Sequence, residues 1–177
     1  MLTFPLPFIE QTKELIGTEW EAFEQALQSD APVSIRLNDK INKNLSYERV
    51  PWCSSGYYLP ERPLFTADPL LHAGVYYVQE AGSMFLEQVI GQHIHKPVYA
   101  LDLCAAPGGK STHLSNLLPE GSFLISNETI RQRANILAEN LQKWGNPNVA
   151  VTNNSAADFG KLPSLFDVIV TDVPCSG

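Results

Sequence analysis

Residues 101–112, LDLCAAPGGKST, place a cysteine, a proline, two glycines and a lysine in one turn after an apolar run. Gly109-Lys110-Ser111 could end a phosphate-binding loop of the form G-x-x-x-x-G-K-[ST]. That loop needs a glycine at position 104, where this chain has a cysteine, and Pro107 has no N–H to donate to a phosphate. The segment therefore disfavours a nucleoside triphosphate, but its glycines still let the backbone approach a ligand closely.

Two acidic residues could complete a ligand site with this turn. Glu128 ends the apolar segment GSFLISNE, 20 residues after Gly108, and Asp172 ends the segment FDVIVTD. An acidic side chain at the end of the second strand of a nucleotide-binding sheet can accept hydrogen bonds from both ribose hydroxyls. Taken singly, these features could be a plain tight turn, a surface glutamate and a strand-end cap. Together they favour a cofactor that contains adenosine, although the glycine spacing is not the G-x-G-x-x-G of dinucleotide folds.

The elements that must position these residues alternate after Pro97. Apolar segments end in LDLC, SNE, VTN and VTD, and helical patterns cover residues 111–118 and 130–144. Alternating strands and helices with apolar strands predict an α/β fold, with a parallel sheet covered by helices on both faces. The ligand of such a sheet lies outside the carboxyl ends of the strands.

The part before this alternation has a different pattern. A helix is predicted in TEWEAFEQAL, with Trp20, Phe23 and Leu27 on one packed face, and a strand in VSIRLN. Residues 51–70 hold four prolines and are predicted to form a loop, and QEAGSMFLEQVIG is predicted to form a helix that ends at Gly91. We expect two domains, a small α/β domain over residues 1–95 and a second domain over residues 96–177.

Composition limits the class of protein. The 177 residues are 44% hydrophobic, and no apolar run is long enough for a membrane span. The N-terminus lacks the pattern of a secretory signal, and three widely spaced cysteines favour a reducing cytoplasm over a disulfide framework. We expect no metal site, and read His93 and His95 as surface residues.

The net charge of −7 disfavours a nucleic-acid partner, but the charge is uneven. Residues 1–30 hold six acidic residues and one lysine, whereas a mixed group of basic residues around Arg36 follows. We expect Arg36 and its basic neighbours to form a face that contacts RNA.

Several of these segments resemble one known family. LDLCAAPGGK, SNE and DVPCSG are similar to motifs of the Sun/Nop-type RNA cytosine-C5 methyltransferases, and the similarity is greatest to the RsmF-like bacterial branch that acts on ribosomal RNA. SIRLN and HAGVYYVQEAGSMF resemble the leading domain of that family. The resemblance implies a Rossmann-like sheet that binds S-adenosyl-L-methionine, of which this chain holds the first four strands.

The resemblance also implies roles for individual residues. The cofactor would be bound by Cys104, Ala105, Ala106, Pro107, Gly108, Gly109, Lys110, Glu128, Ser155 and Asp172. Asp158 is close to the adenine contact expected at Ser155 but out of register, and Val173 replaces the alanine usual in the family. The catalytic residues would be Cys175, Asp172 and Lys110.

The implied reaction needs a cysteine because C5 of cytosine is too weak a nucleophile to take a methyl group unaided. A thiolate that adds to C6 activates C5. By resemblance, Cys175 assists release of the product, while the nucleophile belongs to a later threonine–cysteine motif. We therefore expect the 177-residue chain alone to be inactive towards cytosine and to oligomerise through an exposed sheet edge.

Three alternatives remain open at this point. One is a methyltransferase that acts on an amino nitrogen, although VPCSG has no aromatic residue beside its proline. Another is a non-catalytic RNA-binding or assembly module. The third is transfer RNA, rather than ribosomal RNA, as the substrate.

Overall fold

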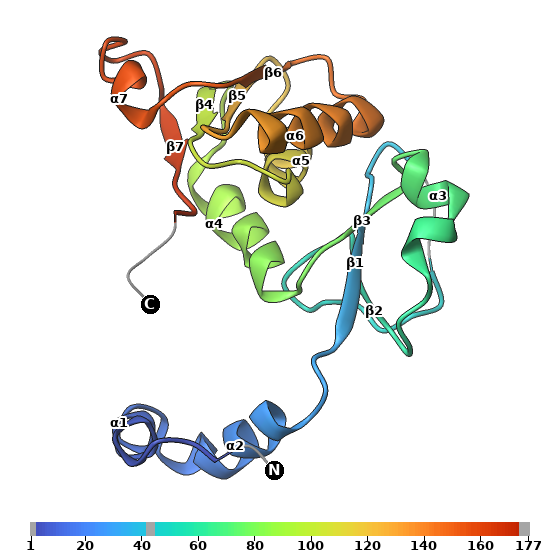
Figure 1. Cartoon of the computed structure of the whole chain (residues 1–177), viewed down its shortest axis with the longest axis vertical. Helices are drawn as coiled ribbons and strands as arrows, with labels where there is room; N and C mark the ends of the chain where they lie inside the picture. Colours follow the sequence, from blue (N-terminus) through green and yellow to red (C-terminus); the bar gives the residue numbers. More distant parts are fainter. Residues whose placement is uncertain (1–2, 42–44, 174–177) are drawn as a thin grey trace. The chain divides into compact units, whose positions relative to one another are not determined.

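The computed structural model describes residues 3–41 and 45–173. The chain forms two compact units, of which the first ends at Pro32 and the second begins at Val33. Figure 1 labels the elements. Among the described residues, no helix has the length and apolar character needed to cross a membrane.

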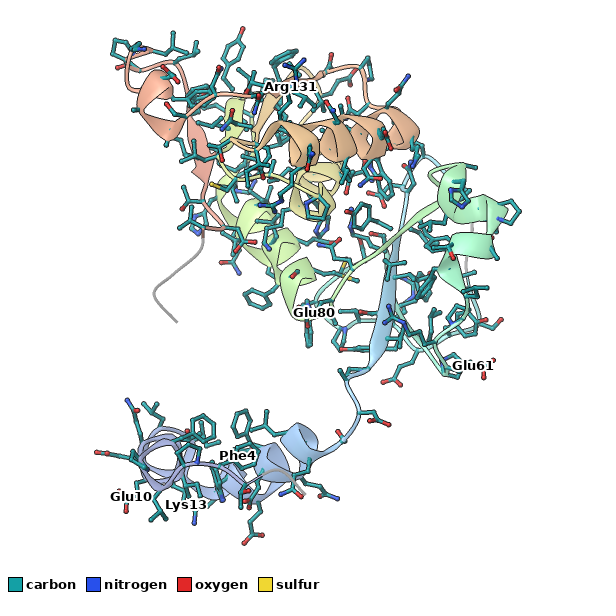
Figure 2. The ribbon with its side chains drawn as sticks, in the orientation of Figure 1. Phe4, Glu10, Lys13, Glu61, Glu80 and Arg131 are labelled. Atoms are coloured by element: carbon teal, nitrogen blue, oxygen red, sulfur yellow. The ribbon has the colours of Figure 1, made fainter. Side chains whose placement is uncertain are left out.

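The first unit consists of the helices α1 (Leu6–Ile16) and α2 (Trp20–Gln28), joined by the 3-10 turn η1 (Gly17–Glu19). Trp20 is buried, and its ring meets that of Phe8 edge-on at a centroid distance of 6.3 Å. The ammonium of Lys13, labelled in Figure 2, lies 5.5 Å from the centre of the Trp20 ring. The predicted helix is confirmed, but Phe23 and Leu27 on its expected packed face remain partly exposed.

The second unit begins with a three-stranded antiparallel sheet in the order β2-β1-β3. Its strands are β1 (Val33–Leu37), β2 (Gly56–Leu59) and β3 (Tyr76–Val78). The strand predicted in VSIRLN is confirmed as β1, whereas the loop predicted over residues 51–70 is wrong, because it contains β2, the 3-10 turn η2 (Phe65–Ala67) and the short helix α3 (Pro69–His72). One side of this sheet is a core of Ile35, Leu37, Tyr57, Phe65 and Tyr76.

The chain then passes through a 3-10 turn, η3 (Gly82–Phe85), into the helix α4 (Leu86–His93). A four-stranded parallel sheet follows, in the order β6-β5-β4-β7. Its strands are β4 (Tyr99–Asp102), β5 (Phe123–Asn127), β6 (Val149–Thr152) and β7 (Val168–Val170). The predicted parallel α/β sheet is confirmed.

Helices lie on both faces of the parallel sheet, but unequally: among the described residues, one face carries only a short helix. The connecting helices are α5 (Gly109–Leu117), α6 (Arg131–Trp144) and α7 (Ala156–Phe159). On one face Ala100 and Leu124 pack against Ile90 of α4 and Leu114 of α5. On the other face Leu101 and Ile169 line a hollow together with Phe159 of α7, which agrees with the alternation of side chains along a strand.

The strand order sets the place of the site. The chain moves from β4 outward through β5 to β6, and then returns to the opposite side of β4 to form β7. A sheet whose strand order reverses in this way opens a crevice beyond the carboxyl ends of the two strands at the reversal. Here those strands are β4, which leads into the glycine turn, and β7, which leads to Asp172.

Candidate functional site

The turn after β4 is a close-packed loop of backbone. Gly108 has a φ of +113°, in the region that favours glycine, and a Cβ there would lie 3.2 Å from Leu137 Cδ1. The carbonyl of Ala106 accepts a 2.8 Å hydrogen bond from the Arg133 guanidinium, and the carbonyl of Pro107 accepts one of 2.8 Å from the Asn140 amide. Two side chains of α6 thus hold the turn, and α5 begins at Gly109 rather than at Ser111 as predicted.

A buried carboxyl group lies directly beneath this turn. Asp102, the last residue of β4, accepts a 2.7 Å hydrogen bond at Oδ2 from the Ser111 hydroxyl. Its Oδ1 is buried and has no partner among the described residues. Burial raises the pKa of Asp102 to about 6, although Ser111 and Lys110 act in the opposite direction. The end of β4 therefore holds a carboxyl group that can be protonated in mildly acidic solution.

Arg36 of β1 ties the antiparallel sheet to the glycine turn. Its guanidinium donates to Gln79 Oε1 at 2.8 Å, to Thr112 Oγ1 at 2.7 Å and to the carbonyl of Gly109 at 3.3 Å. The guanidinium carbon lies 4.6 Å from the centre of the Trp144 ring. Arg36 is fully buried, and burial lowers its pKa to about 10, so that it stays charged near neutral pH. The prediction that Arg36 belongs to an exposed basic face is wrong.

Glu128 lies immediately beyond the end of β5. Its carboxylate accepts a 2.9 Å hydrogen bond at Oε1 from the backbone N–H of Ile130, and Oε2 lies 3.4 Å from the Arg133 guanidinium. The side chain is almost wholly buried. Arg133 therefore contacts both Glu128 and the carbonyl of Ala106, which places the glycine turn and Glu128 in one hydrogen-bonded group.

Lys110 and Asp172 meet across the crevice between β4 and β7. Lys110 Nζ lies 2.7 Å from Asp172 Oδ2, and 64% of the Asp172 side chain is exposed. This contact joins two of the three predicted catalytic residues. The third, Cys175, lies outside the described residues.

A pocket of about 200 Å³ opens between these groups. One wall is the turn from Cys104 to Pro107 with Gly109, Lys110 and Asp172, and the other is formed by β3 and the segment after it. That second wall was not predicted, and consists of Tyr77, Val78, Gln79, Glu80 and Ser83. The carboxylate of Glu80, labelled in Figure 2, accepts hydrogen bonds from the backbone N–H groups of Gly82 and Ser83, which lower its pKa.

The cysteine of the turn is not an activated nucleophile. Burial and the neighbouring carboxylates of Glu128 and Asp102 raise the pKa of the Cys104 thiol. The thiolate is the reactive form of cysteine. Cys104 is thus a neutral thiol in the wall of the pocket.

The expected adenine contact lies apart from this pocket. Ser155 precedes α7, and its hydroxyl donates a 2.6 Å hydrogen bond to Asp158 Oδ2. The two residues form a capping box at the start of α7. The next residues upstream approach the Glu128 region, because the Asn153 amide donates to the Glu128 carbonyl at 2.6 Å.

Another cluster of side chains could accept a metal ion. The ligand atoms of Cys53, Glu87 and His113 lie within 4.8 Å of one another. Burial raises the pKa of the Cys53 thiol to about 11, and hydrogen bonds from His113 and from the Ser54 N–H hold the pKa of Glu87 at about 2 against the effect of burial. The Cys53 thiol is neutral, and the nearby Arg36 cation balances the charge of the ionised Glu87 carboxylate.

The arrangement of strands, glycine turn and acidic residues is that of S-adenosylmethionine-dependent methyltransferases. A methyltransferase homolog from Pyrococcus horikoshii shares the fold, with a TM-score of 0.79 and 26% identity over 98% of this chain and 60% of that one. NSun6 from Pyrococcus horikoshii shares it with a TM-score of 0.74 at 18% identity, covering 97% of this chain and 71% of that one.

Sequence comparison defines the family more narrowly. Residues 4–81 match the model of the N-terminal domain of 16S rRNA methyltransferase RsmF, and residues 92–177 match that of 16S rRNA methyltransferase RsmB/F. The chain belongs to this family of Sun/Nop-type RNA methyltransferases, which use S-adenosylmethionine, and the predicted resemblance is confirmed.

Two curated relatives give the extent of the match. The ribosomal RNA small subunit methyltransferase F of Aliivibrio fischeri is 37% identical over 193 residues, which cover 98% of this chain and 40% of the relative. The protein of the same name from Pectobacterium atrosepticum is 31% identical over 99% of this chain and 40% of its own length. The chain thus spans about two fifths of the length of these relatives.

Proposed function

We propose that this chain is the cofactor-binding part of a methyltransferase that modifies C5 of cytosine in ribosomal RNA. The observation that carries the proposal is the convergence of the glycine turn, Glu128 and the Lys110–Asp172 pair at the reversal of strand order. Ribosomal RNA, rather than transfer RNA, is favoured by the names of the relatives.

The residues present fit S-adenosylmethionine. Gly108 and Gly109 have no side chains, which keeps space beside the turn open. A Cβ on Gly109 would lie 3.3 Å from Tyr77 Cε1 and would fill part of that space. The pocket of about 200 Å³ is smaller than the roughly 300–1,000 Å³ of pockets for drug-sized ligands. It would hold the methionine end, while Glu128 would accept hydrogen bonds from the ribose and Ser155 would lie towards the adenine. When bound, the cofactor supplies an electrophilic methyl group.

The roles of the protein's own groups follow from this placement. Asp172 would lie between the cofactor and the target base, oriented by Lys110 at 2.7 Å. In the family reaction a cysteine thiolate adds to C6, C5 takes the methyl group, a base removes the C5 proton, and the thiolate leaves to restore the ring. Cys175 would assist that last step, and the attacking cysteine would come from a later motif. The target base must leave its stack to reach such a site.

The rest of the proposal concerns the whole protein. Residues 1–95 would form a domain that contributes RNA contacts, and residues 96–177 would bind the cofactor. The exposed edge strand β7 supports association of the isolated chain with another copy, and the free thiols of Cys53 and Cys104 suit a cytoplasmic protein.

The cofactor assignment can be tested by calorimetry with S-adenosylmethionine. Glu128→Ala should weaken binding by about 1.5–3 kcal/mol, the range for hydrogen bonds to a charged group. Because Glu128 also accepts from the Ile130 N–H, Glu128→Gln, which keeps an acceptor, controls for loss of structure, and exposed Glu120→Gln is the matched surface control. Unchanged affinity in a folded Glu128→Ala chain would contradict the ribose assignment.

A further inference from the structure

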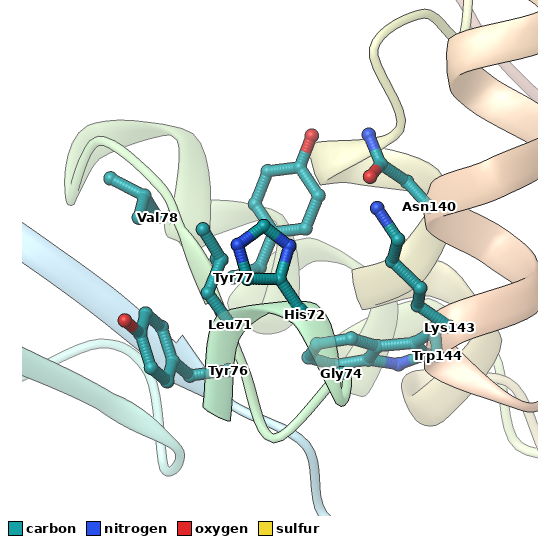
Figure 3. Close-up of a pocket in the computed structure, with 9 residues that line it drawn as sticks. All are labelled: Leu71, His72, Gly74, Tyr76, Tyr77, Val78, Asn140, Lys143 and Trp144. Carbon is teal, nitrogen blue, oxygen red and sulfur yellow. The ribbon is translucent and has the colours of Figure 1, made fainter. Parts of the chain in front are cut away.

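A second pocket lies beside the glycine turn, where β3 and the α3 region meet α6. Its volume is about 260 Å³, and its walls include His72, Tyr76, Tyr77, Asn140, Lys143 and Trp144. Figure 3 shows the side chains of His72, Tyr77, Asn140 and Lys143 ending around one common space. We call it the Lys143 pocket.

The polar ends that face this pocket are largely uncommitted. Within the described parts of the chain, neither the Tyr77 hydroxyl nor the Lys143 ammonium has a hydrogen-bond or ion-pair partner. The Asn140 amide nitrogen donates to the Pro107 carbonyl at 2.8 Å, which leaves its Oδ1 able to accept a hydrogen bond from a ligand. The pocket thus offers a cation, a hydroxyl and a carbonyl oxygen to a ligand.

The aromatic wall is held by several contacts. The Trp144 indole N–H donates to Asn116 Oδ1 at 3.0 Å, and the Arg36 guanidinium carbon lies 4.6 Å from its ring centre. The Tyr77 ring meets Trp144 edge-on, with centroids 6.5 Å apart and planes at 74°. His72 is fixed by a 2.9 Å contact between its Nε2 and the Thr66 carbonyl. A ligand would therefore enter a preformed aromatic site at a small cost in ordering.

The Lys143 pocket adjoins the proposed methyl-transfer pocket. Both pockets are lined by Tyr77 and Val78. Tyr77 also lies against Gly109, and Asn140 bonds to the carbonyl of Pro107 in the turn itself. A strand of nucleic acid that places one base against Lys110 and Asp172 could therefore reach the Lys143 pocket with a nearby nucleotide.

We infer that the Lys143 pocket binds an unstacked base of the RNA substrate that flanks the target cytosine, with Lys143 on its phosphate. Unstacked RNA bases are held by aromatic side chains and by hydrogen bonds to their edges, and lysine contacts phosphate as a point charge. The volume lies below the roughly 300–1,000 Å³ of sites for larger ligands, which suits a single base. The inference rests on the proposed function and names a contact between that site and its substrate.

The test uses the whole 177-residue chain and a fluorescein-labelled single-stranded RNA with one cytosine. Lys143→Met should weaken binding about tenfold at low salt and reduce the slope of log affinity against log salt by about one. Lys96→Met, at another exposed lysine, is the matched control and should change binding little. An RNA with 4-thiouridine next to the cytosine should crosslink to a peptide containing Tyr77, His72 or Lys143.

The outcomes separate this inference from the proposed function, because cofactor binding is measured on the same preparations. Loss of RNA affinity in Lys143→Met with unchanged cofactor affinity supports the pocket. Equal behaviour of Lys143→Met and Lys96→Met, crosslinks confined to other peptides, or a chain that binds the cofactor but no RNA overturns it. A chain that shows the Lys143 effect and binds no cofactor would keep the RNA contact and contradict the proposed cofactor-binding role of this chain.

Discussion

The two strand ends on either side of the crevice are built differently. The turn after β4 is well held: Ala105 and Ala106 are buried, and side chains of α6 and β1 donate to the carbonyl groups of Ala106, Pro107 and Gly109. The end of β7 is open, with Ile169 and Val173 more than half exposed and Asp172 held by Lys110 alone among its described neighbours. In the described chain, therefore, several hydrogen bonds hold the turn after β4, whereas one exposed ion pair holds Asp172.

Packing explains why the turn after β4 is so well defined. Side chains of α6 and β1 lie close to the turn, so that the carbonyls of Ala106, Pro107 and Gly109 meet donors within the protein. The single guanidinium of Arg36 donates to Gln79, which follows β3, and to Gly109 and Thr112 at the start of α5. Its stacking on Trp144 adds the body of α6 to the same group.

The largest expected effect is therefore on Arg36. Arg36→Ala should lower the free energy of unfolding by about 3–4 kcal/mol, because it opens a cavity and leaves buried acceptors unpaired. Urea denaturation measures the change. Arg62→Ala is the control, since Arg62 is exposed and its guanidinium lies 5.6 Å from the Phe65 ring centre; it should cost less than about 1 kcal/mol. Equal losses in the two variants would mean that the Arg36 contacts do not hold the turn.

The parallel sheet was predictable because its strands are short apolar runs with turn residues at regular intervals. The glycine turn, Glu128 and Asp172 were also placed at one edge, because each lies at the carboxyl end of a predicted parallel strand. That edge is confirmed by the contacts of Lys110 with Asp172 and of Arg133 with Glu128 and Ala106. The binding roles of these residues stay predictions.

The antiparallel sheet was harder to predict, for two physical reasons. β2 has only four residues between prolines, and its pairing with β1 joins residues far apart in the sequence, such as Ile35 and Tyr57. The alternation in VSIRL is typical of a strand with one wet face, so that Arg36 was expected in solvent. In the structure the polar face of β1 packs against the glycine turn, and sequence periodicity cannot reveal that a second layer covers it.

A second prediction concerns the pH dependence at the end of β4. Burial raises the pKa of Asp102 from 3.8 to about 6 in the folded chain, so the folded state binds an additional proton between these values. The contribution of Asp102 to stability should therefore fall by about 2–3 kcal/mol as pH rises from about 4 to 6, whereas His113, whose pKa burial lowers, acts in the opposite direction. The pKa of Glu87 is lowered from 4.5 to about 2, so its contribution to stability rises with pH between these values and no longer changes above about pH 5.

Urea denaturation between pH 4.5 and 7 separates these groups. Asp102→Asn should remove most of the fall, because the amide stays neutral throughout and can still accept from the Ser111 hydroxyl. The same slope in Asp102→Asn and in the unaltered chain would show that another group titrates in this range.

The smallest expected effect is at the open side. An exposed ion pair contributes about 0–1 kcal/mol because water screens the charges and both side chains lose freedom. Lys110→Met, Asp172→Asn and the double variant form a cycle whose coupling energy should stay below about 1 kcal/mol and shrink further in salt. Urea denaturation of the four chains gives this coupling. A value of 2 kcal/mol or more would mean that the end of β7 is held as firmly as the turn after β4.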